Sequence, residues 1–326
     1  MGNEADHQPQ TGVKARIDVA VVTFDTAELT VAGIGRLLAS EPDLELHVLV
    51  HDNASIDGTV EAIRAAHPGA SVEACPHNLG FAKGVNQAAA RGDSPWILLL
   101  NPDAWPEPGA IATMLAAAEA HPEAAAVVPR LERPDGDLEH STFPFPTPSV
   151  AALCLVGYQR WLRRTAERRL LVGAWAHDRA RDVEWAVGAA WLVRRSDWEA
   201  IGGLDERFFL YGEDIEWCWR AHDHGRTIRF EPAALVRHVG GASSATSYGP
   251  KTVPAYLANT HRLVRRRRGP LVEAAYRLLN GAGAARLWVG ARRRHDAVGA
   301  RTWAVQVKAA LTPDLGPDGP PPGAAR

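Results

Sequence analysis

IDVAVVTF, residues 17–24, is a short and mostly apolar run in which β-branched side chains recur. A continuous apolar run of this length is typical of a strand that is buried on both faces of a sheet. Two similar runs follow, LELHVLV at 44–50 and WILLLN at 96–101. Between the first two, residues 26–40 place leucine and isoleucine at helical spacing after a threonine that can cap a helix.

This alternation of strands and helices predicts an α/β fold. Strand–helix–strand units of this kind make right-handed crossovers, which place parallel strands side by side and helices on both faces of the sheet. Ligands of such sheets bind beyond the carboxyl ends of the strands. The polar clusters that fall at those ends are Thr23-Phe24-Asp25, Asp52-Asn53 and Asn101-Pro102-Asp103. We therefore expect these clusters to form one ligand site.

The composition is that of an ordinary globular protein, with 46% hydrophobic and 23% charged residues among 326. A formal net charge of -2 argues against a nucleic-acid partner. The three cysteines are far apart in the sequence, which favours a reducing compartment over a disulfide framework or a zinc cluster. The polar N-terminus does not resemble a secretory signal, and no apolar run is long enough to span a membrane. The sequence thus predicts a cytoplasmic protein.

The chain divides into four parts. Residues 1–15 and 311–326 are predicted to be disordered, and residues 16–248 to form one domain with two halves, 16–130 and 131–248. Within the second half, 130–182 is expected to hold loops with one or two helices, and TIRFEP and ALVRHVGG to be separate short strands. From Lys251 to Ala310 there are 13 Lys and Arg residues against two acidic ones, so 249–310 is predicted to be a basic helical extension.

The strand-end clusters allow two interpretations each. Asp103 can bind a divalent cation through oxygen and leave positions open for phosphate, but Asn-Pro-Asp also starts turns. Asp52 can accept a hydrogen bond from the imide N–H of a pyrimidine base, but Asp-Asn is also a common loop start. In NLGFAKGVNQA, Gly80 and Gly84 free the backbone to approach a ligand. Neither the GxGxxG nor the P-loop pattern is present, which argues against a dehydrogenase or a P-loop enzyme.

The stretch FFLYGEDIEWCWR, residues 208–220, places Glu213 and Asp214 among aromatic side chains at the predicted start of a helix. Acidic residues stabilise the first turn of a helix, which is one explanation. The other is chemical, because partial burial raises the pKa of a carboxylate and makes it a better base. Helical spacing predicts that one carboxylate pairs with Arg220 while the other points into a cleft.

His238 follows the apolar run ALVR and precedes two glycines. A neutral imidazole at this point can bind a divalent metal ion, although a single histidine at a strand end is also commonly just hydrogen-bonded.

Taken together, these segments resemble the family-2 inverting glycosyltransferases, especially their rhamnosyltransferase-like branch. The resemblance runs from residue 17 to residue 244. The matching segments, in the order of the family, are VVTF, HDNASIDGT, NLGFAKGVNQA, LLLNPDA, VGAAWLVRRSDWEAIGGLDERFFLYGEDIEWCWR and HVGGASS. The resemblance implies the nucleotide-diphospho-sugar transferase (GT-A) fold, a mixed and mostly parallel sheet flanked by helices. It also implies that 16–248 is the catalytic domain, with the nucleotide-sugar half over 16–130 and the acceptor half over 131–248.

The resemblance also implies roles for individual residues. Asp214 matches the general base, Asp103 and His238 would bind Mg²⁺ or Mn²⁺, and Asn101 stands where many members have aspartate. The nucleotide-binding residues would be Thr23, Phe24, Asp25, Asp52, Asn53, Asn78, Gly80, Gly84, Asn86 and Asn101. The acceptor and sugar pocket would contain Gly188, Ala189, Trp191, Glu213 and Arg220, with Ala190 beside them.

The implied donor is dTDP-L-rhamnose, with a UDP-sugar or GDP-sugar as the alternative. The acceptor would be a glycan or a polyprenyl-diphosphate-linked sugar in cell-wall assembly. Residues 262–295 mix arginines with apolar side chains, and such a segment can lie on the inner face of an anionic membrane or cap the catalytic domain. A sugar-phosphate nucleotidyltransferase lacks support because no glycine-rich loop follows the first strand. A non-catalytic nucleotide-sugar-binding protein remains the other alternative, and the oligomeric state stays open.

Overall fold

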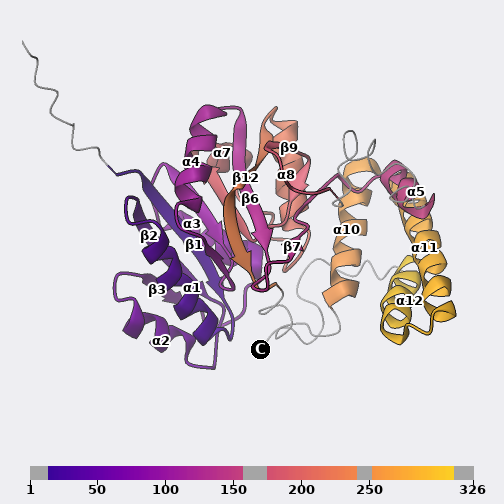
Figure 1. Ribbon diagram of the computed structural model, residues 1–326, viewed down its shortest axis with the longest axis horizontal. Coiled ribbons are helices and arrows are strands. Elements are labelled where there is room, and N and C mark those ends of the chain that lie inside the picture. Colours follow the sequence, from indigo (N-terminus) through magenta and orange to yellow (C-terminus); the bar gives the residue numbers. More distant parts are fainter. Residues whose placement is uncertain (1–13, 157–174, 241–251, 312–326) are drawn as a thin grey trace, which may run out of the picture.

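The computed structural model describes residues 14–156, 175–240 and 252–311 (Figure 1). The predicted disordered ends lie almost entirely outside the described residues. The strands are β1 (Arg16–Thr23), β2 (Glu45–Asp52), β3 (Ser71–Ala74), β4 (Trp96–Leu100), β5 (Ala104–Pro106), β6 (Ala124–Glu132), β7 (Leu138–Glu139), β8 (Thr142–Phe143), β9 (Arg181–Val183), β10 (Trp185–Ala186), β11 (Ala190–Arg194) and β12 (Thr227–His238). The helices are α1 (Ala27–Ser40), α2 (Thr59–Ala66), α3 (Phe81–Ala90), α4 (Ala110–Ala120), α5 (Pro148–Val156), α7 (Arg195–Ile201), α8 (Glu213–Asp223), α10 (Thr252–Arg268), α11 (Pro270–Arg293) and α12 (Ala297–Leu311).

The centre of the molecule is a mixed sheet in the order β3-β2-β1-β4-β11-β6-β12-β5. The four strands from the first part of the chain, β3, β2, β1 and β4, are parallel to one another. Strand β11 runs antiparallel between β4 and β6, and β12 runs parallel to β6. The predicted α/β class and the predicted strands at 17–24, 44–50 and 96–101 are confirmed, with ends shifted by one or two residues.

Two hydrophobic cores cover the two faces of this sheet. Ile17, Val19 and Val21 of β1 point into the core that contains side chains of α1, α2 and α4. Ala20 and Val22 point into the opposite core, which contains side chains of α3, α7 and α8. Because both faces are covered, every side-chain position in these strands favours an apolar residue, which explains the continuous apolar runs.

The second half of the chain differs from the sequence prediction in two ways. The segment 130–182 contributes not only α5 but also the short strands β7, β8 and β9 and the end of β6. TIRFEP and ALVRH belong to one strand, β12, whose register against β6 shifts between Glu231 and Leu235. Pro232 lies in this shift, and proline has no N–H to donate to a ladder, so the sheet continues past it only through an irregularity.

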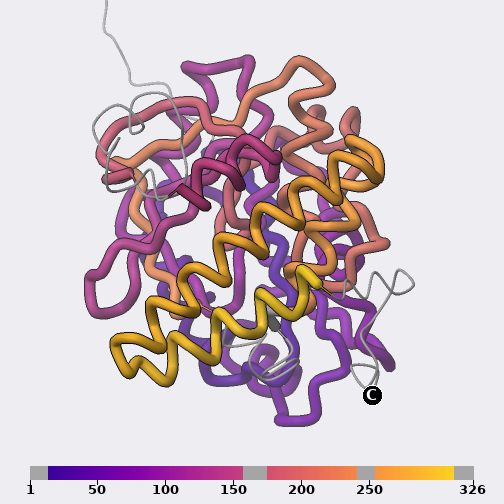
Figure 2. Tube along the Cα trace, turned by 90° about the vertical axis from the view of Figure 1, so that its right-hand side faces the viewer, coloured from indigo at the N-terminus to yellow at the C-terminus, as the bar shows by residue number. Residues whose placement is uncertain are grey.

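The C-terminal helices form a separate layer beside the sheet (Figure 1). Helix α10 lies next to the catalytic part and buries Leu263 and Val264, while α11 and α12 pack against α10 and against each other. Helix α5 packs on α11, so a helix from the middle of the chain also belongs to this layer (Figure 2). No helix within the described ranges is both long enough and apolar enough to cross a membrane.

Candidate active site

A cavity of about 620 Å³ opens at the carboxyl ends of β1 and β4 and extends to the start of α8. The sequence predicted a ligand site at these strand ends. The predicted site residues that line the cavity are Thr23, Phe24, Asn53, Asn78, Gly80, Asn101, Asp103, Gly188, Glu213, Asp214 and His238. They come from stretches far apart in the sequence, between Thr23 and His238, which the fold brings together.

The β1–β2 side of the cavity is built on the register between these two strands. Thr23 pairs with Asp52 across the two parallel strands, and its hydroxyl donates a 2.8 Å hydrogen bond to Asp52 Oδ1. The next residue, Asn53, donates from Nδ2 to the carbonyl oxygen of Gly80 at 3.1 Å and accepts from the Leu79 N–H at 3.1 Å. The side chain of Asn53 therefore fixes the backbone of the following cavity-lining loop rather than pointing freely into the cavity.

Glu213 and Asp214 are the first two residues of α8, and both line the cavity. Burial raises the pKa of Asp214 to about 6, against the lowering effect of backbone N–H groups that include those of Ile215 and Gly188. Burial, together with the neighbouring charge of Asp214, raises the pKa of Glu213 well above its usual value. Asp214, with a pKa of about 6, is therefore mostly ionised at neutral pH, and Glu213 beside it keeps its proton to a higher pH than an ordinary glutamate does.

Asp103 and His238 lie together in the cavity wall. Asp103 Oδ1 is 3.4 Å from His238 Nε2, and Glu139 Oε2 is 2.9 Å from His238 Nδ1. Burial alone would lower the pKa of His238, but hydrogen bonds and charge from Asp103 and Glu139 raise it to about 9. At neutral pH His238 is therefore an imidazolium held between two carboxylates.

These side chains fit a divalent cation of the magnesium or manganese type. Glu139 holds Nδ1 of His238, which leaves Nε2 turned toward Asp103, and a carboxylate behind a histidine is a common support for a metal ligand. No group of three or more His, Cys, Asp or Glu side chains in the described part of the chain is placed to hold a metal ion alone. Two protein ligands would suit an ion that keeps oxygen ligands from water and phosphate.

The remaining predicted residues do not line the cavity. They are Asp25, Asp52, Gly84, Asn86, Ala189, Trp191 and Arg220. Asp52 is 1% exposed behind Thr23, and Trp191, also 1% exposed, donates its indole N–H to the Val187 carbonyl. The Asn86 amide bonds to the backbone of Leu204, which leads into the segment before α8. For these residues the geometry favours support of the cavity wall over direct contact with a ligand.

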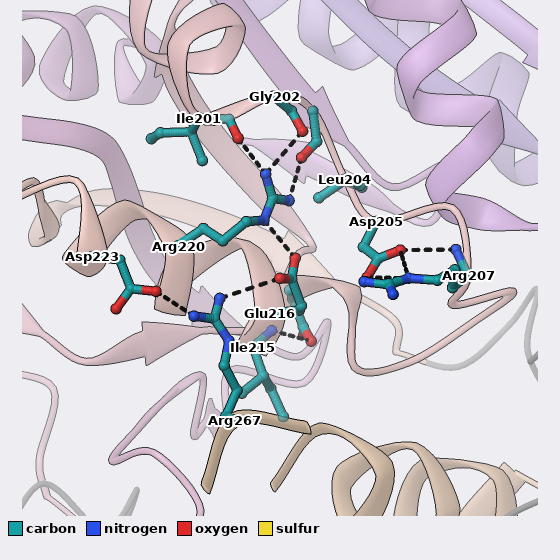
Figure 3. A network of polar contacts seen from close by, with 12 residues as sticks. Ile201, Gly202, Leu204, Asp205, Arg207, Ile215, Glu216, Arg220, Asp223 and Arg267 are labelled. Carbon is teal, nitrogen blue, oxygen red and sulfur yellow. Dashed lines mark hydrogen bonds and ion pairs between the residues drawn. The ribbon is translucent and has the colours of Figure 1, made fainter. Parts of the chain in front are cut away.

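The predicted pairing of Arg220 with Glu213 or Asp214 is wrong. Arg220 Nε donates to Glu216 Oε2 at 2.8 Å, and its other nitrogens donate to the carbonyl oxygens of Ile201, Gly202 and Gly203 (Figure 3). The spacing of four residues brings Glu216 and Arg220 together on one face of α8, whereas Glu213 faces the cavity. Arg220 therefore links α8 to the end of α7 by hydrogen bonds.

Two charged residues of the cavity wall were missed. Glu139 lies on β7, and Arg133 precedes it in the β6–β7 turn and is the single lysine or arginine among the residues that line the cavity. Neither follows an apolar strand of the parallel part, so the rule that ligands bind at such strand ends could not find them. The only local signal is the turn Pro-Asp-Gly at 134–136, which predicts a hairpin but not what it faces.

Comparison with known proteins agrees with this geometry. Residues 18–169 match the model of glycosyl transferase family 2. An N-acetylglucosaminyl-diphospho-decaprenol L-rhamnosyltransferase of Mycobacterium tuberculosis is 33% identical over 205 residues, which are 59% of this chain and 66% of the relative. The rhamnosyltransferase WbbL of Escherichia coli is 33% identical over 86 residues, 26% of this chain and 32% of the relative. The chain thus spans just under two thirds of the mycobacterial relative.

Solved structures show the same fold. The mannosyltransferase PcManGT from Pyrobaculum calidifontis, in complex with GDP-Man and Mn²⁺, superposes with a TM-score of 0.54 at 18% identity and covers 92% of this chain and 81% of its own. GalNAc-T7 with UDP, GalNAc and Mn²⁺ gives a TM-score of 0.52 at 14% identity, over 78% of this chain and 48% of its own. The predicted GT-A fold is confirmed. Residues 18–169 thus carry a glycosyltransferase family 2 domain, and the sequence relatives of the chain include rhamnosyltransferases.

Proposed function

We propose that the protein transfers L-rhamnose from dTDP-L-rhamnose to a hydroxyl of a polyprenyl-diphosphate-linked N-acetylglucosamine, with inversion at the anomeric carbon. The observation that carries this proposal is Asp214, a carboxylate that lines the cavity with a pKa of about 6, in the same cavity wall as the strand-end cluster of β1. A base of this strength is ionised at neutral pH and can still accept a proton readily. The name of the mycobacterial relative supports the choice of sugar and acceptor.

The transfer is a single displacement. The acceptor hydroxyl oxygen attacks the anomeric carbon while its proton passes to a carboxylate oxygen of Asp214. The bond from the anomeric carbon to the diphosphate oxygen breaks, and its electron pair leaves with the nucleoside diphosphate. Glu213, whose raised pKa favours its protonated form, can in that form donate a hydrogen bond to a sugar hydroxyl without adding a second negative charge.

Asp103 and His238 would hold a divalent cation, and Glu139 would keep His238 in place. Such an ion supplies positive charge against the diphosphate as the leaving group becomes more negative. The structures of the mannosyltransferase and of GalNAc-T7 contain Mn²⁺, which supports a divalent ion here, with Mg²⁺ as the alternative. Only a neutral imidazole binds a metal, so His238 has to lose its Nε2 proton when the ion enters.

Donor, acceptor and base are tested in one assay. The purified protein is incubated with dTDP-L-rhamnose, a short polyprenyl-diphosphate-linked N-acetylglucosamine and Mn²⁺, and the disaccharide is detected by mass spectrometry. Asp214→Asn should fold and bind dTDP like the wild type yet lose at least about 10³-fold in turnover. UDP- and GDP-sugars serve as alternative donors. Near-normal turnover by Asp214→Asn would refute the base, and release of dTDP without any acceptor product would refute the acceptor.

The C-terminal helices support contact with a membrane. Leu271, Leu278 and Val298 of α11 and α12 are 86%, 62% and 78% exposed, and exposed arginines such as Arg286 and Arg301 lie on the same two helices. Apolar side chains beside cations suit a membrane surface with anionic lipids. We propose that this surface, which includes the exposed part of 262–295, rests on the inner face of the cell membrane, where a lipid-linked acceptor would be held.

Co-sedimentation with vesicles tests this contact. We expect binding to phosphatidylglycerol vesicles but not to phosphatidylcholine vesicles, and a clear loss of binding for the double variant Leu271→Glu/Leu278→Glu. Ile56, 78% exposed in the loop before α2, offers a matched control, because Ile56→Glu adds a charge away from these helices. Equal binding by the wild type and the double variant would contradict the proposal.

A further inference from the structure

The segment Phe208–Gly212 leads directly into Glu213 and Asp214, and its backbone is held from two sides. On one side, the N–H of Phe81 donates to the carbonyl oxygen of Phe209 at 2.7 Å. On the other side, Nδ2 of Asn259 donates to the carbonyl oxygens of Leu210 at 2.9 Å and Tyr211 at 2.8 Å. Three consecutive carbonyl groups before the base are thus bound to residues distant in the sequence.

Asn259 belongs to α10 and is built into this contact. Its side chain accepts a 2.6 Å hydrogen bond on Oδ1 from Arg262, one turn further along the helix. This bond orients the amide so that its NH₂ group faces the two carbonyl oxygens. Asn259 is 8% exposed, and a β-carbon on Gly212 would lie 3.3 Å from the Asn259 β-carbon. The helix and the segment are therefore in close contact, with little space between them.

The backbone of the held segment is strained. Tyr211 has a φ of +67°, in the left-handed region that residues other than glycine seldom adopt. Gly212 follows with a φ of +97° and caps α8. A strained conformation of this kind persists only when the surrounding structure enforces it. The two hydrogen bonds from Asn259 act on the strained residue and on its predecessor, and so supply that restraint.

Helix α10 also holds the helix that follows the base. Arg267 donates to Glu216 Oε1 at 3.3 Å and makes an ion pair with Asp223, both on α8 (Figure 3). Glu216 in turn binds Arg220. Asn259 and Arg267 thus contact the segment before Asp214 and the helix after it from the same element of the C-terminal layer.

We propose that Asn259 is a positioning residue for Asp214, through which the C-terminal helix α10 keeps the base in its working geometry. This inference rests on the proposed function. The C-terminal extension is then part of the catalytic apparatus and not only a surface for membrane contact. Asn259 itself does not line the cavity, so it acts through the segment 210–212 rather than on a substrate.

The test uses Asn259→Asp in the full-length protein. Aspartate has the same shape but no N–H to donate, so two carbonyl oxygens would face a carboxylate. We expect kcat to fall about 10- to 100-fold, since small displacements of catalytic groups have effects of this size. The Kd for dTDP should stay within about twofold of the wild type, because the nucleotide half is untouched. Asn259→Ala, which only removes the bonds, should show a smaller loss of the same kind.

Thr260→Val is the matched control. Thr260 is 2% exposed on the same helix, and its hydroxyl donates to the carbonyl oxygen of Tyr256 in its own helix, so its kcat should match the wild type. Hydrogen exchange measured by mass spectrometry gives a readout that is independent of turnover. Amides of residues 210–217 should exchange about tenfold faster in Asn259→Asp than in the control, as expected for the loss of two hydrogen bonds.

The outcomes separate the two proposals. Absence of transfer by the wild type would refute the proposed function, and the exchange data would still decide whether Asn259 restrains 210–217. Unchanged kcat together with unchanged exchange in both Asn259 variants would overturn the positioning role. If Asn259→Asp does not fold, Asn259→Ala tests the positioning role. Equal losses in kcat and in dTDP affinity for this variant would indicate a general structural role instead.

Discussion

The backbone of Gly80 lies directly against the backbone of Phe209, so that a β-carbon on residue 80 would sit 2.5 Å from the Phe209 carbonyl oxygen. This contact joins the loop held by Asn53 to the segment that leads into Asp214. The Phe81 N–H donates to the same carbonyl oxygen. The loop that Asn53 holds and the segment before Asp214 are thus fixed to each other at this contact, so a change there affects both.

The first prediction concerns this contact. Gly80 has a φ of +86° and a ψ of 172°, a region that essentially only glycine adopts, whereas Gly58, with a φ of +82° and a ψ of 16°, is in the left-handed helical region. A β-carbon on Gly58 would have no heavy atom within 4 Å beyond its chain neighbours, so Gly58→Ala measures the cost of a left-handed backbone without any steric contact. We expect Gly58→Ala to lower the free energy of unfolding by about 1–2 kcal/mol. Gly80→Ala should cost about 1–3 kcal/mol more, because its backbone region is less open to alanine and because the β-carbon forces the two backbones apart.

Urea unfolding and steady-state kinetics check this prediction together. Gly58→Ala should keep the kcat of the wild type, whereas Gly80→Ala should lose both kcat and affinity for dTDP. If the two variants have equal stability and equal turnover, the contact between residue 80 and Phe209 does not couple the two halves.

The part of the cavity at the strand ends was largely predictable from the sequence. Thr23 and Asp52 end two apolar runs, and parallel strands bring their carboxyl ends to one edge, where the register indeed pairs these residues. Asn101 and Asp103 follow the third run and line the same cavity. Their proximity follows from strand order alone, without knowledge of any side-chain contact.

The residues that depend on tertiary packing were not predictable in this way. Asn259 lies 45 positions after Asp214, in a helix whose sequence, TVPAYLANTHRLVRRRR, contains no pattern that points to the segment before Asp214. Several carboxylates lie close to Arg220 along α8. The carbonyl groups of 201–203 at the end of α7 bind its guanidinium in the position where it also pairs with Glu216. Local periodicity gives the candidates for such contacts, but the neighbouring backbone selects among them.

The second prediction is a pH dependence of transfer. Asp214 must be ionised to accept a proton, and its pKa is about 6. At a Mn²⁺ concentration that keeps the proposed site at His238 occupied at every pH, transfer should therefore be nearly constant above pH 7 and fall about tenfold for each pH unit below 6. The measurement is kcat/KM from pH 5 to 8.5, with circular dichroism at each pH as the control for folding. A rate that stays constant down to pH 5 in a folded protein would exclude Asp214 as the base.

The third prediction concerns stability. The folded-state pKa of Glu213 is raised above its unfolded value. Its protonated form therefore contributes to the free energy of unfolding at low pH, and this contribution is lost as pH rises through the raised pKa. Glutamine at this position stays neutral at every pH, and Glu213 Oε2 has no hydrogen-bond partner to lose among the described residues. Glu213→Gln should therefore melt at the same temperature as the wild type at pH 4 and at a higher temperature at pH 9.

Differential scanning calorimetry of the two proteins between pH 4 and pH 9 measures this difference. Asp205, which binds Arg207 and has a lowered pKa, is a control of opposite sign. Relative to the wild type, Asp205→Asn should become less stable as pH rises above 4. A constant difference in melting temperature between Glu213→Gln and the wild type at all pH values would show that burial does not raise the pKa of Glu213.

The last prediction concerns the cation. If Asp103 and His238 hold Mn²⁺, Asp103→Asn should weaken Mn²⁺ binding in the presence of dTDP by at least about 10- to 100-fold, because even outer residues of metal sites have effects of this size. Asp43→Asn, at an exposed aspartate that does not line the cavity, is the matched control for the loss of one negative charge. Electron paramagnetic resonance of free Mn²⁺ measures the affinity without relying on turnover. Identical Mn²⁺ titrations for Asp103→Asn and Asp43→Asn would place the ion elsewhere, and transfer that survives a chelator in the wild type would show that charge from the protein alone is enough to release the diphosphate.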